Sequence, residues 1–120
     1  MGLLHSMASR VAEGDTVQFR PSGASMAPLI RNRQLVSVAP VDAAKLDIGD
    51  IVLARVAGTV YLHQVSAVDR ERGRVRISNN RGRVNGWTAF ARVYGICVAV
   101  DGEDRPSARA KVRPAGVWSG

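Results

Sequence analysis

Most of this chain consists of short apolar segments, roughly four to eight residues long, that alternate with polar residues or run continuously. These segments are rich in β-branched residues and are separated by Gly, Asp or Asn, whereas helical periodicity is almost absent. The pattern predicts strands, and their number at close spacing favours a mostly β domain with a coiled antiparallel sheet. At most one short helical turn is expected. The predicted strands are residues 16–20, 34–41, 50–56, 59–68, 74–78 and 94–101, with a weaker segment at 87–92.

Turn signals lie between these segments. Ala57 and Gly58 are expected to form a tight hairpin between two strands, and residues 69–73 to join the next pair. The dipeptide Asn85-Gly86 is a further turn or loop signal.

The length of 120 residues fits a single folding unit. We expect a flexible N-terminal segment (1–14), a β domain (15–102) and a basic flexible tail (103–120), because the tail follows neither helical nor strand periodicity. The single cysteine, Cys97, lies in an apolar run, which predicts a buried thiol and argues against a disulfide or a zinc site. No metal and no cofactor are expected.

Membrane insertion is not indicated. No stretch approaches the roughly 18 consecutive apolar residues that span a bilayer, and the first residues are too short and too mixed for a signal sequence. We therefore expect a soluble, cytoplasmic chain without a membrane span.

The chain carries 17 Lys and Arg against 10 Asp and Glu, a net charge of +7. Many of the additional charges lie between Arg70 and Arg83 and in the tail after Asp104, where they could bind a nucleic acid or an acidic protein. Only 5% of the residues are aromatic, and the basic segments contain none of the interleaved aromatics that stack bases. Nucleic-acid binding is therefore a secondary hypothesis.

The segment 23–32 (GASMAPLIRN) places one hydroxyl, that of Ser25, where small residues lead into a turn. Gly23 permits a backbone conformation that is closed to other residues, and Pro28 presets φ for a helical turn. The free N–H groups of such a turn suit an oxyanion. Ser25 is thus either a nucleophile or an ordinary N-cap.

A serine hydroxyl needs a base to become a nucleophile near neutral pH. His63 is the only histidine in the predicted β domain, on the second strand of the Ala57-Gly58 hairpin. A neutral imidazole can accept the proton, although a histidine in a strand is more often structural.

The joint order of motifs resembles the S24/S26 peptidases, the superfamily of the self-cleaving LexA-like repressors and the signal peptidases. The pattern is Gly-x-Ser-Met-x-Pro-x-Ile at 23–30, a strand ending at Pro40, Gly-Asp-Ile-Val at 49–52, and then a strand with a base. The resemblance covers roughly residues 19–100. It implies a LexA/signal-peptidase-like β fold and a serine peptidase in which Ser25 attacks a peptide carbonyl and His63 takes the place of the more common lysine.

The resemblance also implies supporting roles. The backbone N–H of Ser25 is the natural oxyanion donor, while Met26 and Pro28 form the wall beside the nucleophile. Asn79, Asn80 and Ser22 are the candidates for orienting the histidine or supporting the oxyanion.

The chain departs from the family pattern at acidic positions. Asn79 stands where an aspartate is expected, and Asn85 replaces a further acidic residue. An amide can orient a histidine but stabilises an imidazolium less well than a carboxylate does. Arg33-Gln34 also replaces a common Gly-Asp.

Two functions compete on this basis. The first is a serine endopeptidase that cleaves peptides or processes itself through a Ser25–His63 dyad. The second is a catalytically impaired binding module for nucleic acid or an acidic protein, using Arg70 to Arg83 and the basic tail. LexA-like domains often pair through their C-terminal strands, so the resemblance admits a homodimer through residues 94–100.

Overall fold

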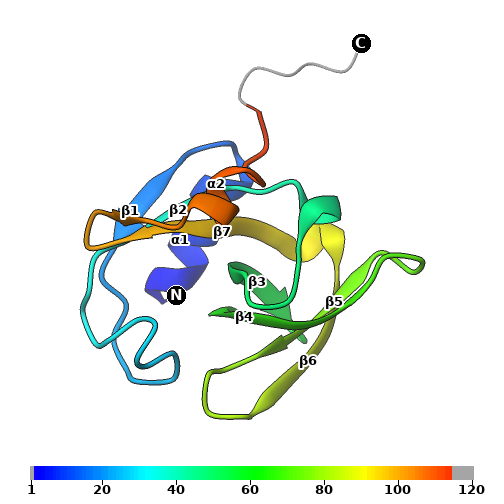
Figure 1. The fold of residues 1–120 in the computed structure, drawn as a ribbon, viewed down its shortest axis with the longest axis horizontal. Helices are drawn as coiled ribbons and strands as arrows, with labels where there is room; N and C mark the ends of the chain where they lie inside the picture. Colours follow the sequence, from blue (N-terminus) through cyan, green and yellow to red (C-terminus); the bar gives the residue numbers. More distant parts are fainter. Residues whose placement is uncertain (1, 115–120) are drawn as a thin grey trace.

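Eight antiparallel strands form one sheet in the computed structural model, which describes residues 2–114 (Figure 1). The sheet order is β1-β2-β7-β3-β4-β5-β6, and β8 pairs with the end of β7. The prediction of a mostly β, antiparallel domain is confirmed. The strands are β1 (Val17–Phe19), β2 (Val36–Pro40), β3 (Ile51–Val56), β4 (Thr59–Asp69), β5 (Arg74–Ser78), β6 (Val84–Ala89), β7 (Val93–Val100) and β8 (Glu103–Asp104).

The hairpin of β3 and β4 turns at Ala57 and Gly58, as the sequence indicates. Both residues have positive φ, 48° and 85°, as the tight two-residue hairpin turns require. Short 3₁₀ turns, η1 (Ala43–Lys45) and η2 (Phe90–Arg92), connect other strands.

The expectation of a turn at Asn85-Gly86 is wrong, because both residues lie inside β6. Ile77 pairs with Gly86 and Ser78 with Val84, so Asn85 is an extra residue on its strand, as at a β-bulge. Gly86 has a φ of 138°, which explains why a glycine is needed there.

The sheet curls until its last strand meets a strand three places away. The Thr88 hydroxyl of β6 donates a hydrogen bond of 2.6 Å to the carbonyl of Arg55 on β3. Gly86 lies so close to Val56 that an added Cβ would be 3.2 Å from its Cγ1. Apolar side chains fill the molecule in two clusters, one beneath the N-terminal helix and one within the curl of β3 to β7.

The N-terminal segment is a helix, α1 (Leu3–Ala12), and not the flexible segment expected for residues 1–14. Its inward side chains recur at helical spacing, at Leu4, Met7, Ala8 and Val11, and they contact the first apolar cluster. The helix ends in a Schellman motif at Gly14, whose φ is 107°. Burial of this face holds the helix on the sheet.

Gly95 of β7 allows α1 to approach the sheet closely. An added Cβ would lie 2.7 Å from Val11 Cγ1 and 2.8 Å from the carbonyl oxygen of Ala39. These distances are too short for any side chain, so only glycine fits at this position.

Residues 103–113 are also ordered, contrary to the expected flexible tail; residues 115–120 lie outside the described part. They form β8 and a short helix, α2 (Pro106–Arg109). Val112 then bridges Val41, and the N–H of Arg113 donates to the carbonyl of Pro40.

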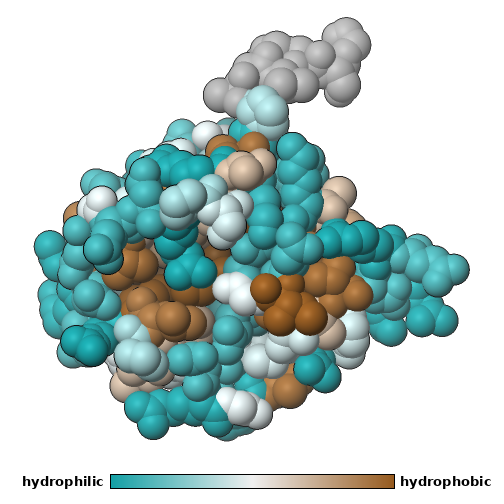
Figure 2. Space-filling model, in the orientation of Figure 1, coloured by the Kyte–Doolittle hydropathy of each residue, from teal (hydrophilic) through white to brown (hydrophobic). Residues whose placement is uncertain are grey.

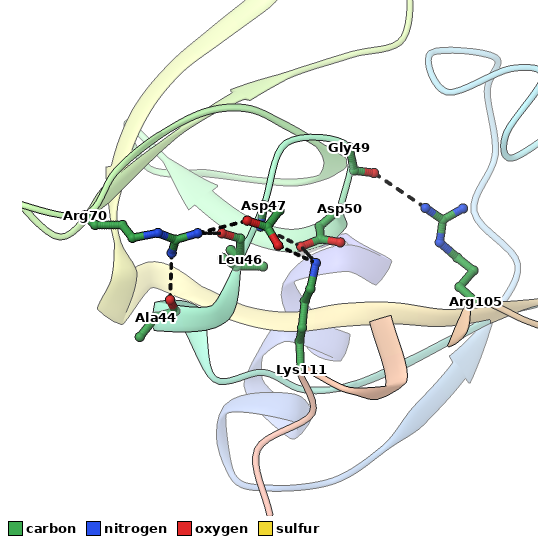
Figure 3. A network of polar contacts seen from close by, with 8 residues as sticks. All are labelled: Ala44, Leu46, Asp47, Gly49, Asp50, Arg70, Arg105 and Lys111. Carbon is green, nitrogen blue, oxygen red and sulfur yellow. Dashed lines mark hydrogen bonds and ion pairs between the residues drawn. The ribbon is translucent and has the colours of Figure 1, made fainter. Parts of the chain in front are cut away.

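A network of polar contacts binds this C-terminal segment to the turn before β3 (Figure 3). Lys111 Nζ lies 2.7 Å from Asp50 Oδ2 and 3.2 Å from Asp47 Oδ2. Asp50 is only 5% exposed. Burial lowers the pKa of Lys111, but the hydrogen bonds and charges of the two aspartates outweigh it and hold that pKa above its ordinary value.

Strand β7 lies between β2 and β3, so both of its edges are occupied within the chain. It offers no free edge to a second copy, which corrects the expectation of pairing through residues 94–100. Cys97, on this strand, is fully buried, and burial raises the pKa of its thiol to about 11.

None of the helices in the described residues is both long and apolar enough to cross a membrane.

Replacing Lys111 should test the network in Figure 3. Lys111→Met keeps the apolar stem but leaves Asp50 buried without its cation, so we expect the free energy of unfolding to fall by about 3 kcal/mol. Urea denaturation measures this loss. Lys45→Met, at an exposed lysine that forms no ion pair with the described residues, is the matched control and should change stability little. Equal stability of the two variants would contradict the structural role of the network.

Candidate active site

Ser25 lies in the loop between β1 and β2. Gly23 adopts a φ of 104° and donates its N–H to Asn32 Oδ1 at 2.8 Å, which closes the base of the loop. Hydrogen-bonded turns follow at residues 25–29, and the N–H of Ile30 donates to the carbonyl of Met26. The side chains of Met26 and Ile30 are buried in the core. The loop is therefore anchored on both sides of a half-exposed Ser25.

Asn80 ties this loop to the hairpin of β5 and β6. Its backbone N–H donates to the carbonyl of Ser25 at 2.8 Å, and its side-chain Nδ2 donates to the carbonyl of Ala27 at 2.9 Å. Gln64, next to His63 on β4, donates to Asn80 Oδ1 at 3.1 Å. Asn80 is thus a positioning residue for the loop and does not contact the imidazole through a hydrogen bond.

His63 lies on β4 opposite Val52 and is 8% exposed. Its Nε2 is 3.1 Å from Ser25 Oγ, and its Nδ1 is 2.7 Å from Asn85 Oδ1. An amide oxygen only accepts hydrogen bonds, so Nδ1 carries the proton and Nε2 presents its lone pair to the hydroxyl. This is the tautomer that a general base requires.

Burial lowers the pKa of His63 from its ordinary value of 6.5, while the hydrogen bond with Asn85 acts in the opposite direction. Tyr61, two residues earlier on the same strand, stacks on the imidazole with ring centroids 5.0 Å apart. The neutral imidazole therefore persists below the pH at which an exposed histidine becomes protonated.

The residue that holds the imidazole is Asn85, and not Asn79. The Oδ1 atom of Asn79 instead accepts the N–H groups of Arg81 and Arg83, both at 2.9 Å, and closes the turn between β5 and β6. The register shift in β6 turns the extra residue, Asn85, toward His63. In the sequence, the dipeptide Asn85-Gly86 suggested a turn. The only sign that Asn85 could hold the imidazole was its place at an acidic position of the S24/S26 pattern.

A pocket of about 80 Å³ opens beside the Ser25 hydroxyl. Met26 lines it, as expected, and so does Ser22, whose hydroxyl makes no hydrogen bond within the described residues. Pro28 does not line this pocket and faces a second, more open depression. The N–H of Ser25 donates no hydrogen bond within residues 2–114, so it is free to bind an oxyanion.

Leu4 of α1 also lines the pocket, a contribution that the sequence analysis missed together with the helix. Figure 2 shows an apolar area over α1 that is surrounded by hydrophilic residues. The remaining lining residues are Pro21, Gly23, Ile30, Arg31, Tyr61 and Leu62.

Within the described chain, no group of three or more His, Cys, Asp or Glu side chains is arranged to hold a metal ion. Comparison with protein-family models, curated proteins and solved structures finds no match to this chain.

The imidazole environment can be tested by NMR titration without any substrate. We expect the pKa of His63 to lie below 6.5 and to rise in Asn85→Asp, because a carboxylate beside Nδ1 favours the imidazolium. The chain has two histidines, and the loss of one signal in His63→Gln assigns the resonance. An unchanged pKa in Asn85→Asp would argue against the contact.

Proposed function

We propose that this chain is a serine peptidase of the S24/S26 type that uses Ser25 as nucleophile, His63 as general base and Asn85 as the orienting residue. The observation that carries the proposal is the hydrogen-bonded series from Asn85 through His63 to Ser25, at 2.7 and 3.1 Å. The order of motifs in the sequence supports the same assignment.

The reaction follows from these contacts. Ser25 Oγ attacks the carbonyl carbon of a peptide bond while its proton passes to His63 Nε2. The oxyanion that forms is stabilised by the N–H of Ser25. His63 then donates the proton to the leaving amine, and the acyl group remains on Ser25. His63 then takes a proton from a water molecule, whose oxygen attacks the acyl carbon. The ester bond to Ser25 Oγ breaks, the acid leaves, and His63 returns the proton to Oγ.

Asn85 makes this base different from one held by an aspartate. It fixes the tautomer but provides no negative charge for the imidazolium that forms in the transition state. The proposed enzyme is therefore slow near neutral pH, although its base stays neutral and available over a wider acidic range. A slow peptidase is suited to the processing of a few specific peptide bonds and not to general protein degradation.

The alternative function, binding of a polyanion by residues 70–83 and the basic tail, has less support. The guanidinium of Arg70 donates to Asp47 and to two backbone carbonyls, and Arg72 and Arg74 pair with Asp69. In the tail, Arg109 pairs with Asp104 and Lys111 with Asp50. These five charges are thus paired within the chain, whereas Arg81 and Arg83 of the same segment form no ion pair in the described residues.

Covalent labelling tests the proposal directly. An alkyl fluorophosphonate should modify Ser25 in the wild type, and His63→Ala should slow this labelling by roughly a hundredfold because general-base catalysis is lost. Intact mass with peptide mapping measures the rate and the site. Ser22→Ala removes a hydroxyl from the same pocket and should still be labelled. Folded wild type that remains unlabelled would refute the peptidase proposal.

The pocket predicts a preference for small acyl groups, with Leu4 as one boundary. Leu4→Ala should raise the relative rate of acylation by 4-nitrophenyl hexanoate over the acetate, about fourfold for each additional methylene accommodated. Nitrophenol release measures both rates. Leu3→Ala is the matched control, since Leu3 is its neighbour in α1 but is 48% exposed and does not line this pocket. If both variants kept the wild-type ratio, Leu4 would not limit the pocket.

A further inference from the structure

Four exposed arginines lie on the two segments that meet at Ser25. Arg31 and Arg33 belong to the loop between β1 and β2, and Arg81 and Arg83 to the turn between β5 and β6. Within residues 2–114 none of their guanidinium groups is within ion-pair distance of a carboxylate. These charges form no ion pair within the described residues, although Arg31 also lines the second, more open depression together with Asp101 and Glu103.

The same two segments contain no acidic residue. Residues 20–34 and 78–89 include neither Asp nor Glu, and asparagines occupy positions 79, 80 and 85. Arg20 also lies in the first segment, but its charge acts on Asp101 and helps to lower the pKa of that carboxyl, after the hydrogen bonds from Leu35 and Gln34. Arg20 is therefore not one of the four arginines considered to act at Ser25.

Two of the four arginines are placed directly at the nucleophile. Arg31 lines the same pocket as Ser25 and His63. Arg81 donates from Nε to the carbonyl of Ala24, the residue before Ser25, at 3.1 Å, and the rest of its guanidinium remains exposed. Arg33 and Arg83 are exposed two residues further along the same two segments.

We infer that the substrate is an acidic peptide, with Asp or Glu close to the small residue whose carbonyl Ser25 attacks. This inference rests on the proposed peptidase function and specifies its substrate class. A carboxylate beside the scissile bond would meet Arg31 and Arg81, and since the Debye length is about 8 Å at physiological salt, nearby charges matter most. A cationic peptide would meet only like charge there.

Three fluorophosphonates of equal chain length test the inference, ending in a carboxylate, a carboxamide or a quaternary ammonium. Rates of Ser25 labelling are divided by the rate of probe hydrolysis to remove intrinsic reactivity. At low salt we expect the carboxylate probe to react about fivefold faster than the carboxamide, and the ammonium probe to be slowest. The differences should shrink in 0.5 M NaCl as the charges are screened.

Charge reversal provides the variant and its control. Arg31→Glu should invert the order, so that the ammonium probe reacts fastest, an outcome that a loss of folding cannot produce. Arg92→Glu makes the same change of charge at an exposed arginine on η2, outside the pocket, and should keep the wild-type order.

The outcomes separate the inference from the function on which it rests. Equal rates for the three probes, with labelling that still depends on His63, would overturn the acidic-substrate inference alone. No labelling by any probe would overturn both. A short single-stranded DNA that protected Ser25 from labelling at far lower concentration than a glutamate-rich peptide would assign these arginines to nucleic acid and also overturn the inference.

Discussion

The curl of the sheet is the constraint on which the candidate site depends. Strand β5 lies between β4 and β6, so a flat sheet would keep Asn85 two strands away from His63. The curl closes through the bond from Thr88 to Arg55 and the close approach of Gly86 to Val56. The extra residue in β6 then points inward, and its amide reaches the imidazole. The geometry of the candidate site is thus a product of how β6 meets β3.

Amides, and not carboxylates, lie around His63 and Ser25, which gives the candidate site an unusual electrostatic balance. With asparagine beside His63, the hydrogen-bonded series to Ser25 carries no formal charge at rest. The four arginines on the segments that meet at Ser25 form no ion pair within residues 2–114, and Arg31 places positive charge at the wall of the pocket. An amide beside His63 supports an imidazolium less than a carboxylate would, and it adds no negative charge that would repel an anionic ligand. In the proposed function, reactivity and substrate charge are therefore linked through the asparagine beside His63.

Strands with a clear apolar pattern could be predicted from the sequence. The order of the motifs around Ser25 and His63 also predicted that these two side chains meet. The helix α1 was missed although Leu4, Met7, Ala8 and Val11 recur at helical spacing, because the pattern covers only about two helical turns. The order of the C-terminal segment could not be predicted, since it depends on the contact of Lys111 with Asp50, 61 positions away. Asn-Gly usually marks a turn, and only the paired strands show that it belongs to a bulge.

The burial of the sole cysteine has a consequence for how the folded state can be observed. Cys97 lies in the core beneath α1, and its raised pKa leaves almost no thiolate at neutral pH. A thiol reagent can therefore reach it only when the helix or the sheet opens. The rate at which the thiol is modified therefore reports how often the structure around Cys97 opens. The native chain thus contains a probe of local unfolding at one defined position.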